Sequence, residues 1–92
     1  MSAEERDMNV YAEVLSAINE IKRTGFTVDT VEPDFYLGGD LGVDSREMLE
    51  IWYELEQRLS VRIADSDKRD RYTLQDVVDV LSAQLNNRAL VA

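Results

Sequence analysis

Three stretches of the chain place apolar residues at helical spacing, and the first lies near the N-terminus. Apolar positions recur every three or four residues from about Asp7 to Thr24, which predicts a helix with one buried face. Its predicted stripe consists of Val10, Tyr11, Val14, Leu15, Ile18 and Ile21. Gly25 is suited to the position just after a helix, so we expect the helix to stop there. The pattern leaves open an earlier start near Ser2, with Glu5 completing a capping box.

The second helical pattern covers about Ser45 to Leu59. Asp44 or Ser45 is suited to cap its N-terminus, and Glu47 puts a negative charge in its first turn. The predicted buried stripe consists of Met48, Ile51, Trp52, Leu55 and Leu59. We expect core packing from Trp52, and the alternative is that it shapes a cleft in which a bound chain is sheltered.

The last helical pattern begins after Thr73. Thr73 followed by Asp76 resembles a capping box in which the shorter acid takes the reciprocal place. The predicted stripe consists of Leu74, Val77, Val78, Leu81 and Leu85. We expect the tail from Asn86 to Ala92 to fray.

Between the first two helices, residues 26–44 lose the helical period. This connection holds the one proline, Pro33, and three of the four glycines. A loop of this length suits a small domain only if its own side chains anchor it to the core. The candidate anchors are Phe26, Val28, Val31, Phe35, Tyr36, Leu37 and Leu41. We expect a packed loop with one helical turn near Pro33–Tyr36.

The remaining segments are short. Residues 61–64 alternate apolar and polar side chains over too few positions for a strand, and the charged residues 65–71 leave room for a short third helix. No amphipathic helix can bury its stripe alone. The sequence therefore predicts an all-α fold, a small four-helix bundle of three main helices and one short helix with a long first loop. We expect residues 1–92 to form a single domain with a folded core over about residues 7–85.

Composition narrows the classes of function. The net charge of −9, from 19 acidic and 10 basic residues, would repel a nucleic-acid backbone. The chain has no cysteine and no histidine, so it lacks a thiol nucleophile, the usual general base and the commonest neutral metal ligand. We expect no catalytic residue, no metal site and no nucleic-acid partner. The polar N-terminus and the lack of any apolar run near about 18 residues predict a soluble cytoplasmic monomer without membrane contact.

The candidate chemistry lies where the glycine-containing turn meets the second predicted helix. Ser45 falls at the start of that helix, where we expect its hydroxyl to be exposed. Free backbone N–H groups and the helix dipole favour a phosphate at such a position, although Asp44 and Glu47 partly oppose it. The alternative is that Ser45 is simply the helix cap. With no histidine to activate the hydroxyl, a catalytic serine is disfavoured.

The residues around Ser45 carry a resemblance. Asp40 to Ser45 reads D-L-G-V-D-S and resembles the D-L-G-x-D-S signature of acyl carrier proteins. Glu50, the run 54–56 and residues 73–81 are similar to that family's acidic second helix and its final helix, so the resemblance spans roughly residues 10–85. It implies that Ser45 is the attachment site of 4′-phosphopantetheine, with Asp44 as the motif residue beside it.

The resemblance also implies a mechanism. A phosphopantetheinyl transferase moves the arm from coenzyme A onto the serine, and the terminal thiol of the arm carries an acyl-type intermediate as a thioester. The chain would then be a carrier for fatty acid, polyketide or related biosynthesis, and not an enzyme. Two alternatives stay open: a carrier for an amino acid or aryl acid, and a non-covalent adaptor with the carrier fold but no arm.

The second predicted helix is also the candidate partner surface. Residues 40–56 contain six acidic residues and one basic residue, Arg46. The resemblance implies that this helix docks basic patches on acyl-loading and acyl-processing enzymes, and the alternative is a solvated helix face. Arg46 stands where the family usually has leucine, which indicates either altered partner choice or a tolerant exposed position. The predicted partner-binding residues are Arg46, Glu47, Leu49, Glu50, Tyr53 and Glu54.

Overall fold

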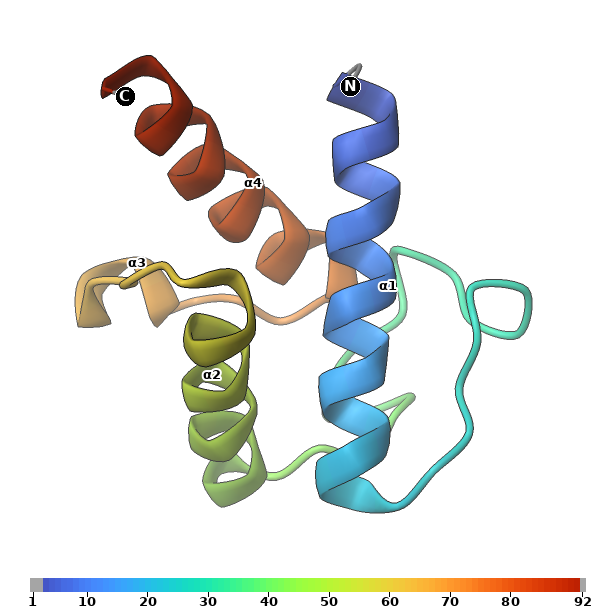
Figure 1. Ribbon diagram of the computed structural model, residues 1–92. Coiled ribbons are helices and arrows are strands. Elements are labelled where there is room, and N and C mark those ends of the chain that lie inside the picture. The colour runs from blue at the N-terminus through green and yellow to red at the C-terminus, as the bar shows by residue number, and fades with distance from the viewer. Residues whose placement is uncertain (1–2, 92) are drawn as a thin grey trace.

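A computed structural model describes the backbone of residues 3–91 and the side chains of residues 8–87. Within this range the chain forms four helices, α1 (Ala3–Lys22), α2 (Ser45–Leu59), α3 (Asp65–Lys68) and α4 (Leu74–Val91). The long helix α1 packs against both α2 and α4, and α3 contacts α4 (Figure 1). The prediction of a small all-α bundle, with three main helices and one short helix, is confirmed.

The core is built from the predicted stripes of the three long helices. Every residue of those stripes is either buried or packed against the buried cluster. The largest fully buried side chains are Val14, Ile18, Ile51, Leu55, Leu74, Val77 and Leu81. Burying an aliphatic side chain of this size contributes about 1.5–3 kcal/mol relative to leaving it exposed. The apolar contact of α1 with α2 and α4 therefore holds the three helices together.

The first helix ends earlier than expected. Arg23, with φ of 58°, takes the left-handed position after Lys22, and the Thr24 amide donates to the Asn19 carbonyl at 3.1 Å. This is the bonding pattern of a Schellman motif. The prediction that Gly25 fills that position is wrong, because the helix has already closed two residues before it. The helix starts as early as Ala3, and the capping box suggested for Ser2 and Glu5 lies outside the described side chains.

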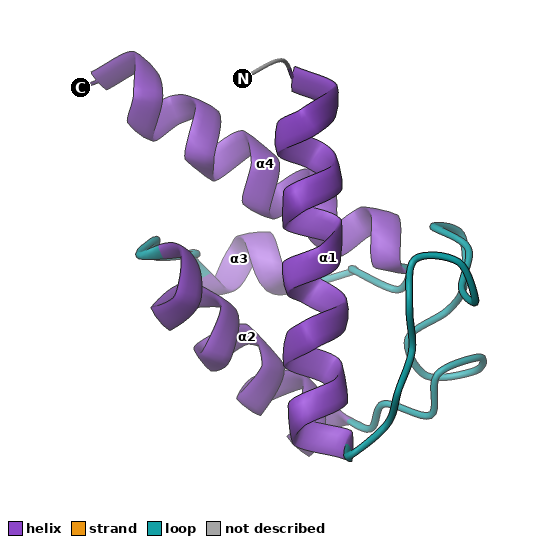
Figure 2. Cartoon of the chain, turned by 45° about the vertical axis from the view of Figure 1, so that its right-hand side comes forward, coloured by secondary structure: helices purple, strands orange, loops and turns teal. Residues whose placement is uncertain are grey.

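The long loop is held by backbone hydrogen bonds to the start of α4. Tyr36 pairs with Thr73 in an isolated bridge, and the Leu37 amide donates to the Tyr72 carbonyl at 2.8 Å. Figure 2 shows the loops, in teal, crossing beside α1. The segment before α2 is thereby fixed to the segment before α4, and the long connection counts as part of the fold.

Side chains of the loop complete its anchoring, with differences from the prediction. Val31, Leu37 and Leu41 are buried and Phe26 and Phe35 pack against the core, as expected. Val28 and Tyr36 are exposed, while Val43, which was not among the predicted anchors, is buried. In place of the helical turn expected near Pro33–Tyr36, a single hydrogen-bonded turn runs from the Glu32 carbonyl to the Phe35 amide at 3.0 Å.

The last helix is longer than its apolar stripe. It begins at Leu74, where the expected capping box is present: the Asp76 amide donates to Thr73 Oγ1 at 3.1 Å, and the Thr73 amide donates to Asp76 Oδ2 at 3.0 Å. The helix continues to Val91, past Leu85, after which the tail was expected to fray. No glycine or proline follows Leu85, so nothing in the local sequence interrupts the helix.

Candidate functional site

Ser45 is the first residue of α2, and its side chain is exposed. The helix is capped by Asp44, whose Oδ1 accepts from the Glu47 amide at 2.8 Å, while Glu47 Oε1 accepts from the Asp44 amide at 3.0 Å. This reciprocal pair is a capping box. Among the described residues, none hydrogen-bonds the Ser45 hydroxyl. The capping role therefore belongs to Asp44, and the hydroxyl of Ser45 is available for chemistry.

The turn before Ser45 is fixed from the end of α1. The Lys22 ammonium donates to the Gly42 carbonyl at 2.7 Å and to the Glu47 carboxylate at 3.0 Å. Gly42 has φ of 71°, the left-handed region in which glycine avoids the strain of a side chain. The glycine of the D-L-G-V-D-S segment is thus favoured by the backbone, and Lys22 adds a tie to α1 beside the backbone hydrogen bonds that hold the turn, such as that from the Val43 amide to the Leu37 carbonyl at 2.9 Å.

A hollow of about 230 Å³ adjoins Ser45. It is lined by Leu37, Gly38, Val43, Asp44, Ser45, Met48, Arg71 and Tyr72. One wall thus comes from the turn and α2, and the other from the segment between α3 and α4. Arg71 and Tyr72 were not predicted as site residues, because their closeness to Ser45 arises from the tertiary fold and leaves no signal in the local sequence.

The polar groups of the second wall are ordered by local hydrogen bonds. Arg71 Nε donates to the Asp67 carbonyl at 2.8 Å, and the Tyr72 hydroxyl donates to Asp70 Oδ1 at 2.9 Å. This hydrogen bond and the charge of Asp70 raise the pKa of the Tyr72 hydroxyl. These bonds hold a neutral phenol and a guanidinium in place on two residues that line the hollow.

Four of the predicted partner-binding residues face away from the protein on α2. Arg46 is 91% exposed, and Leu49 and Tyr53 are 69% and 66% exposed. Glu50 is exposed as well, and its carboxylate lies 4.0 Å from Arg46 Nε. These four residues, which we call the α2 strip, form an apolar pair flanked by one weakly associated ion pair.

The other two predicted partner-binding residues are engaged within the fold. Glu47 binds Lys22, and Glu54 accepts from Arg58 Nε at 3.0 Å. Arg58 also reaches α1, where it donates to Ser16 Oγ at 2.7 Å and pairs with Glu13 and Glu20. The hydrogen bond to Glu54 is the largest cause that raises the pKa of Arg58. Glu47 and Glu54 therefore join α2 to its neighbours.

The remaining acids of the segment are also paired. Asp40 accepts from the Tyr36 amide at 2.8 Å, and Glu56 pairs with Lys68 of α3 at 2.7 Å. Of the six acidic residues between positions 40 and 56, Glu50 has the weakest contact with the described part of the chain. Three of the four glutamates of α2 therefore form ion pairs within the fold, while Asp40 and Asp44 accept hydrogen bonds from backbone amides.

Trp52 lies in the core, with 3% of its side chain exposed. It adjoins the other buried residues of α2, Ile51 and Leu55. It does not line the hollow beside Ser45. Packing is the role that this position supports.

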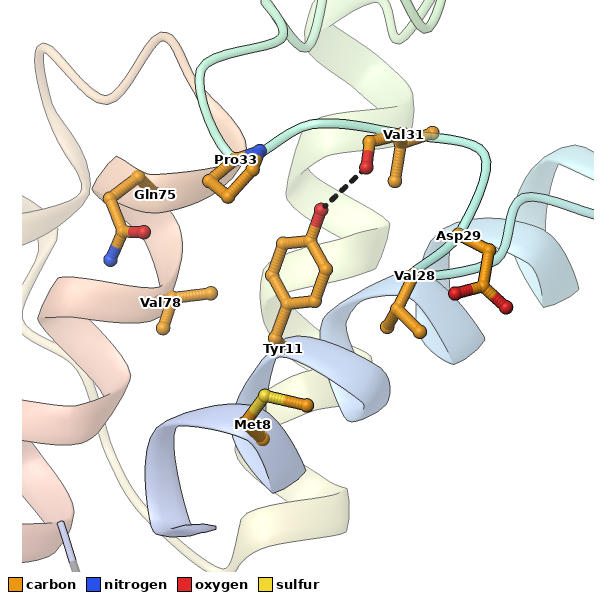
Figure 3. Close-up of a pocket in the computed structure, with 8 residues that line it drawn as sticks. All are labelled: Met8, Tyr11, Val28, Asp29, Val31, Pro33, Gln75 and Val78. Carbon is orange, nitrogen blue, oxygen red and sulfur yellow. Dashed lines mark hydrogen bonds between the residues drawn. The ribbon is translucent and has the colours of Figure 1, made fainter. Parts of the chain in front are cut away.

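A second, larger hollow of about 380 Å³ lies between α1, the long loop and α4 (Figure 3). It is lined by Met8, Tyr11, Val28, Asp29, Val31, Pro33, Gln75 and Val78. The Tyr11 hydroxyl donates to the Val31 carbonyl at 3.5 Å, and burial is the main cause that raises the pKa of Tyr11. This hollow shares no lining residue with the one beside Ser45, so it is a separate feature.

Two further findings concern the described residues. They include no group of three or more acidic, histidine or cysteine side chains placed to hold a metal ion. No helix among them combines the length and the apolar character needed to cross a membrane.

The bundle and its presented serine have the form of a small carrier domain, and comparison with known proteins identifies the family. The chain is 38% identical over 72 residues to an acyl carrier protein of Kineococcus radiotolerans, covering 76% of this chain and 89% of that protein. It is 32% identical over 71 residues to an acyl carrier protein of Myxococcus xanthus, covering 75% of this chain and 90% of that protein. The chain therefore belongs to the acyl carrier protein family, whose members are carriers rather than catalysts.

A third relative is far longer. It is a polyunsaturated fatty acid synthase polypeptide from Thraustochytrium sp., and it is 36% identical over 78 residues, which is 84% of this chain and 3% of that protein. This chain thus corresponds to one small segment of that protein. No profile of a known protein family matches the chain.

Proposed function

We propose that this protein carries acyl-type intermediates as thioesters on a 4′-phosphopantetheine arm attached to Ser45. The observation that carries the proposal is the exposed Ser45 hydroxyl, which is relieved of helix capping by Asp44. The enzymes served would belong to fatty acid, polyketide or related biosynthesis. The arm fits the site, because the hydroxyl is free and opens beside a hollow.

The residues of the chain present the arm and do not perform its chemistry. When attached, phosphopantetheine supplies the thiol, which this chain lacks because it has no cysteine. Attachment would form a phosphodiester at Ser45 Oγ and break the pyrophosphate bond of coenzyme A, with adenosine 3′,5′-bisphosphate as the leaving group and the serine proton passing to the transferase. Lys22, Gly42 and Glu47 hold the turn, so that the transferase meets the hydroxyl in one conformation.

For the docking surface, the structure favours the α2 strip of Arg46, Leu49, Glu50 and Tyr53. The net charge of −9 would steer basic partner surfaces toward the protein at low salt. The exposed Leu49 and Tyr53 would then supply apolar contact once the partner has arrived. We assign Glu47 and Glu54 a structural role, because their carboxylates already pair with Lys22 and Arg58.

The test is intact-mass measurement after incubation with coenzyme A and a broad-specificity phosphopantetheinyl transferase. We expect the wild type to gain the mass of one phosphopantetheine group and Ser45→Ala to gain none. Ser66→Ala, which changes another exposed serine near the start of a helix, is the matched control and should be modified fully. No mass gain in the wild type, or a gain that persists in Ser45→Ala, would refute covalent carriage and favour a non-covalent adaptor.

Intact-mass measurement can also identify the class of cargo. If the holo-protein is offered loading enzymes with acyl, aryl or amino acid substrates, the mass of the resulting thioester identifies the cargo. Acyl loading is the expected result, and an aminoacyl or aryl thioester would indicate the alternative kind of carrier.

A further inference from the structure

Arg71 lines the hollow beside Ser45 and has most of its hydrogen-bonding capacity unused. Its Nε donates to the Asp67 carbonyl at 2.8 Å, which orients the guanidinium. No carboxylate of the described side chains lies within the 4.0 Å of an ion pair with it. The two terminal nitrogens therefore keep donors available, and Arg71 lines both the hollow beside Ser45 and another hollow that includes Asp67 and Asp79.

The neighbouring carboxylates have donors of their own. Asp70 accepts from the Tyr72 hydroxyl at 2.9 Å, and Asp76 accepts from the backbone amides of Tyr72 and Thr73. On the opposite wall, Asp44 accepts from the amide of the third residue of α2. The charge of Arg71 adds a small part to the lowered pKa of Asp76, but no carboxylate among the described side chains forms an ion pair with it, so the guanidinium remains available to an anion that enters the hollow.

Arg46 is nearer to Ser45 in the sequence but is placed differently. Its side chain is 91% exposed, lies 4.0 Å from Glu50 and does not line the hollow. An anion bonded to Ser45 Oγ can enter the hollow toward Arg71 or remain on the outer face near Arg46. The hollow has protein around it whereas the outer face near Arg46 is surrounded by water, so salt screens a contact with Arg71 less than one with Arg46 but still weakens it.

We propose that Arg71 is a positioning residue for the arm and that its guanidinium binds the phosphate which joins the arm to Ser45. This rests on the proposed function, since the phosphate is present only when the arm is attached. A planar guanidinium matches two phosphate oxygens at once, which fixes direction as well as distance. The arm then leaves Ser45 across the hollow toward α3 and α4, and Arg46 remains free for partner enzymes.

The test is a thermodynamic cycle on the apo- and holo-proteins of the wild type, Arg71→Gln and Arg46→Gln. Intact mass first establishes that the arm is attached, and urea unfolding then gives the effect of the arm on the unfolding equilibrium constant. Attachment of the arm changes the unfolding equilibrium constant by a factor that can be compared between variants. We expect this factor to be less stabilising by about threefold or more in Arg71→Gln than in the wild type, and to be unchanged in Arg46→Gln. The Arg71 coupling should shrink as NaCl is raised, because the site is open to solvent.

A second readout reports the contact directly. In the holo-protein, the ³¹P resonance of the phosphodiester should shift in Arg71→Gln and stay at the wild-type position in Arg46→Gln. Arg71→Lys retains the charge without the planar fork, so it should fold like the wild type and show an intermediate shift. It serves as the second variant if Arg71→Gln is unstable.

The outcomes separate the two proposals. No mass gain in the wild type removes the proposed function and this inference with it. If the arm attaches, but the Arg71 variants keep the wild-type ³¹P resonance and the wild-type effect of the arm on stability, the role of Arg71 is overturned and the carrier function stands.

Discussion

The Lys22 ammonium at the end of α1 lies 3.0 Å from the Glu47 carboxylate in the first turn of α2. The same ammonium donates to the Gly42 carbonyl, and only 16% of the Lys22 side chain is exposed. Glu47 in turn accepts from the Asp44 amide. One cation thus connects the end of the first helix, the glycine turn and the cap of the helix that begins at Ser45.

Replacing this cation should weaken the whole fold. We expect Lys22→Met to lower the free energy of unfolding by about 1.5–3 kcal/mol, because it removes two charge-assisted hydrogen bonds and leaves Glu47 without its partner. Urea unfolding measures the change. Arg46→Gln, on an exposed side chain, is the control and should shift the value by less than about 0.5 kcal/mol. Equal effects of the two variants would contradict the role assigned to Lys22.

We expect Asp44 to cap α2 and the adjacent Ser45 to be the residue that is modified, so substitutions at the two positions should have different effects. Asp44→Ala should destabilise the protein by about 0.5–2 kcal/mol, since it removes the acceptor for the Glu47 amide. Ser45→Ala should leave stability nearly unchanged while abolishing attachment of the arm. Urea midpoints together with intact mass test both variants. A loss of stability in Ser45→Ala as large as in Asp44→Ala would return the capping role to the serine.

The cap of α4 should make stability depend on pH. Backbone hydrogen bonds from Tyr72 and then from Thr73 hold the pKa of Asp76 below its usual range. A carboxyl with a depressed folded-state pKa adds stability above its unfolded pKa of about 4, and that stability is lost as the pH falls through the folded value. Asp76→Asn should therefore melt at a lower temperature than the wild type at pH 7, by about 1 kcal/mol in stability.

The difference between the two melting temperatures should begin to close as the pH falls below about 4 and should shrink further as Asp76 itself becomes protonated. Thermal unfolding of both proteins across this range is the measurement. A difference that stays constant down to pH 3 would show that the charge of Asp76 contributes nothing to the cap.

Partner recognition should follow exposure more closely than charge. Leu49→Ala or Tyr53→Ala should reduce the kcat/KM of the transferase for the apo-protein by about fivefold or more, if either side chain is an anchor of the interface. Glu54→Gln should have little effect, because Glu54 already pairs with Arg58. The assay is arm transfer at saturating coenzyme A. A larger loss of kcat/KM in Glu54→Gln than in the two apolar variants would instead support docking through the acidic residues of α2.

Trp52 should act through packing. We expect Trp52→Leu to cost about 2 kcal/mol or more of stability, since it leaves space in the core, and to leave modification of Ser45 intact. If the tryptophan also shelters cargo, the variant should hydrolyse a long-chain thioester faster, relative to the wild type, than a short-chain one. Equal relative rates at every chain length would limit Trp52 to its packing role.

The helices were predictable because their signals are local. The spacing of residues such as Val14, Ile18 and Leu81 reports a buried face whatever the rest of the chain does. The choice between Asp44 and Ser45 as cap stayed open from residue preference alone. Glu47 decides between them. It stands three residues after Asp44, the spacing that a capping box requires, so the box forms with Asp44 as the cap and not with Ser45.

The end of α1 shows where a residue preference misleads. Gly25 is the better left-handed residue, yet Arg23 takes that conformation at a cost of about 1–2 kcal/mol. The Schellman hydrogen bond of Thr24 and the packing of the helix fix the position of the turn. Preference for glycine is a weak signal when tertiary contacts determine the length of a helix.

The candidate site was predictable only in part, for a different physical reason. The D-L-G-V-D-S segment pointed to Ser45, but the pairing of Glu47 with Lys22 and of Glu54 with Arg58 depends on how α1 meets α2. The same is true of Arg71, which is distant from Ser45 in the sequence and lines the hollow beside it only because of the tertiary fold. Counting acids along one helix cannot show which of them the protein already uses.

The bridge between Tyr36 and Thr73 has a consequence for how the serine becomes available during folding. It joins segments distant in sequence, so it can form only when a large loop closes. The amides of Leu37 and Leu74, both bonded across this junction, should therefore exchange with deuterium only through near-global opening. A nascent or partly unfolded chain would lack the turn that presents Ser45. The transferase would then attach the arm only to completely folded molecules, and only these would carry acyl groups.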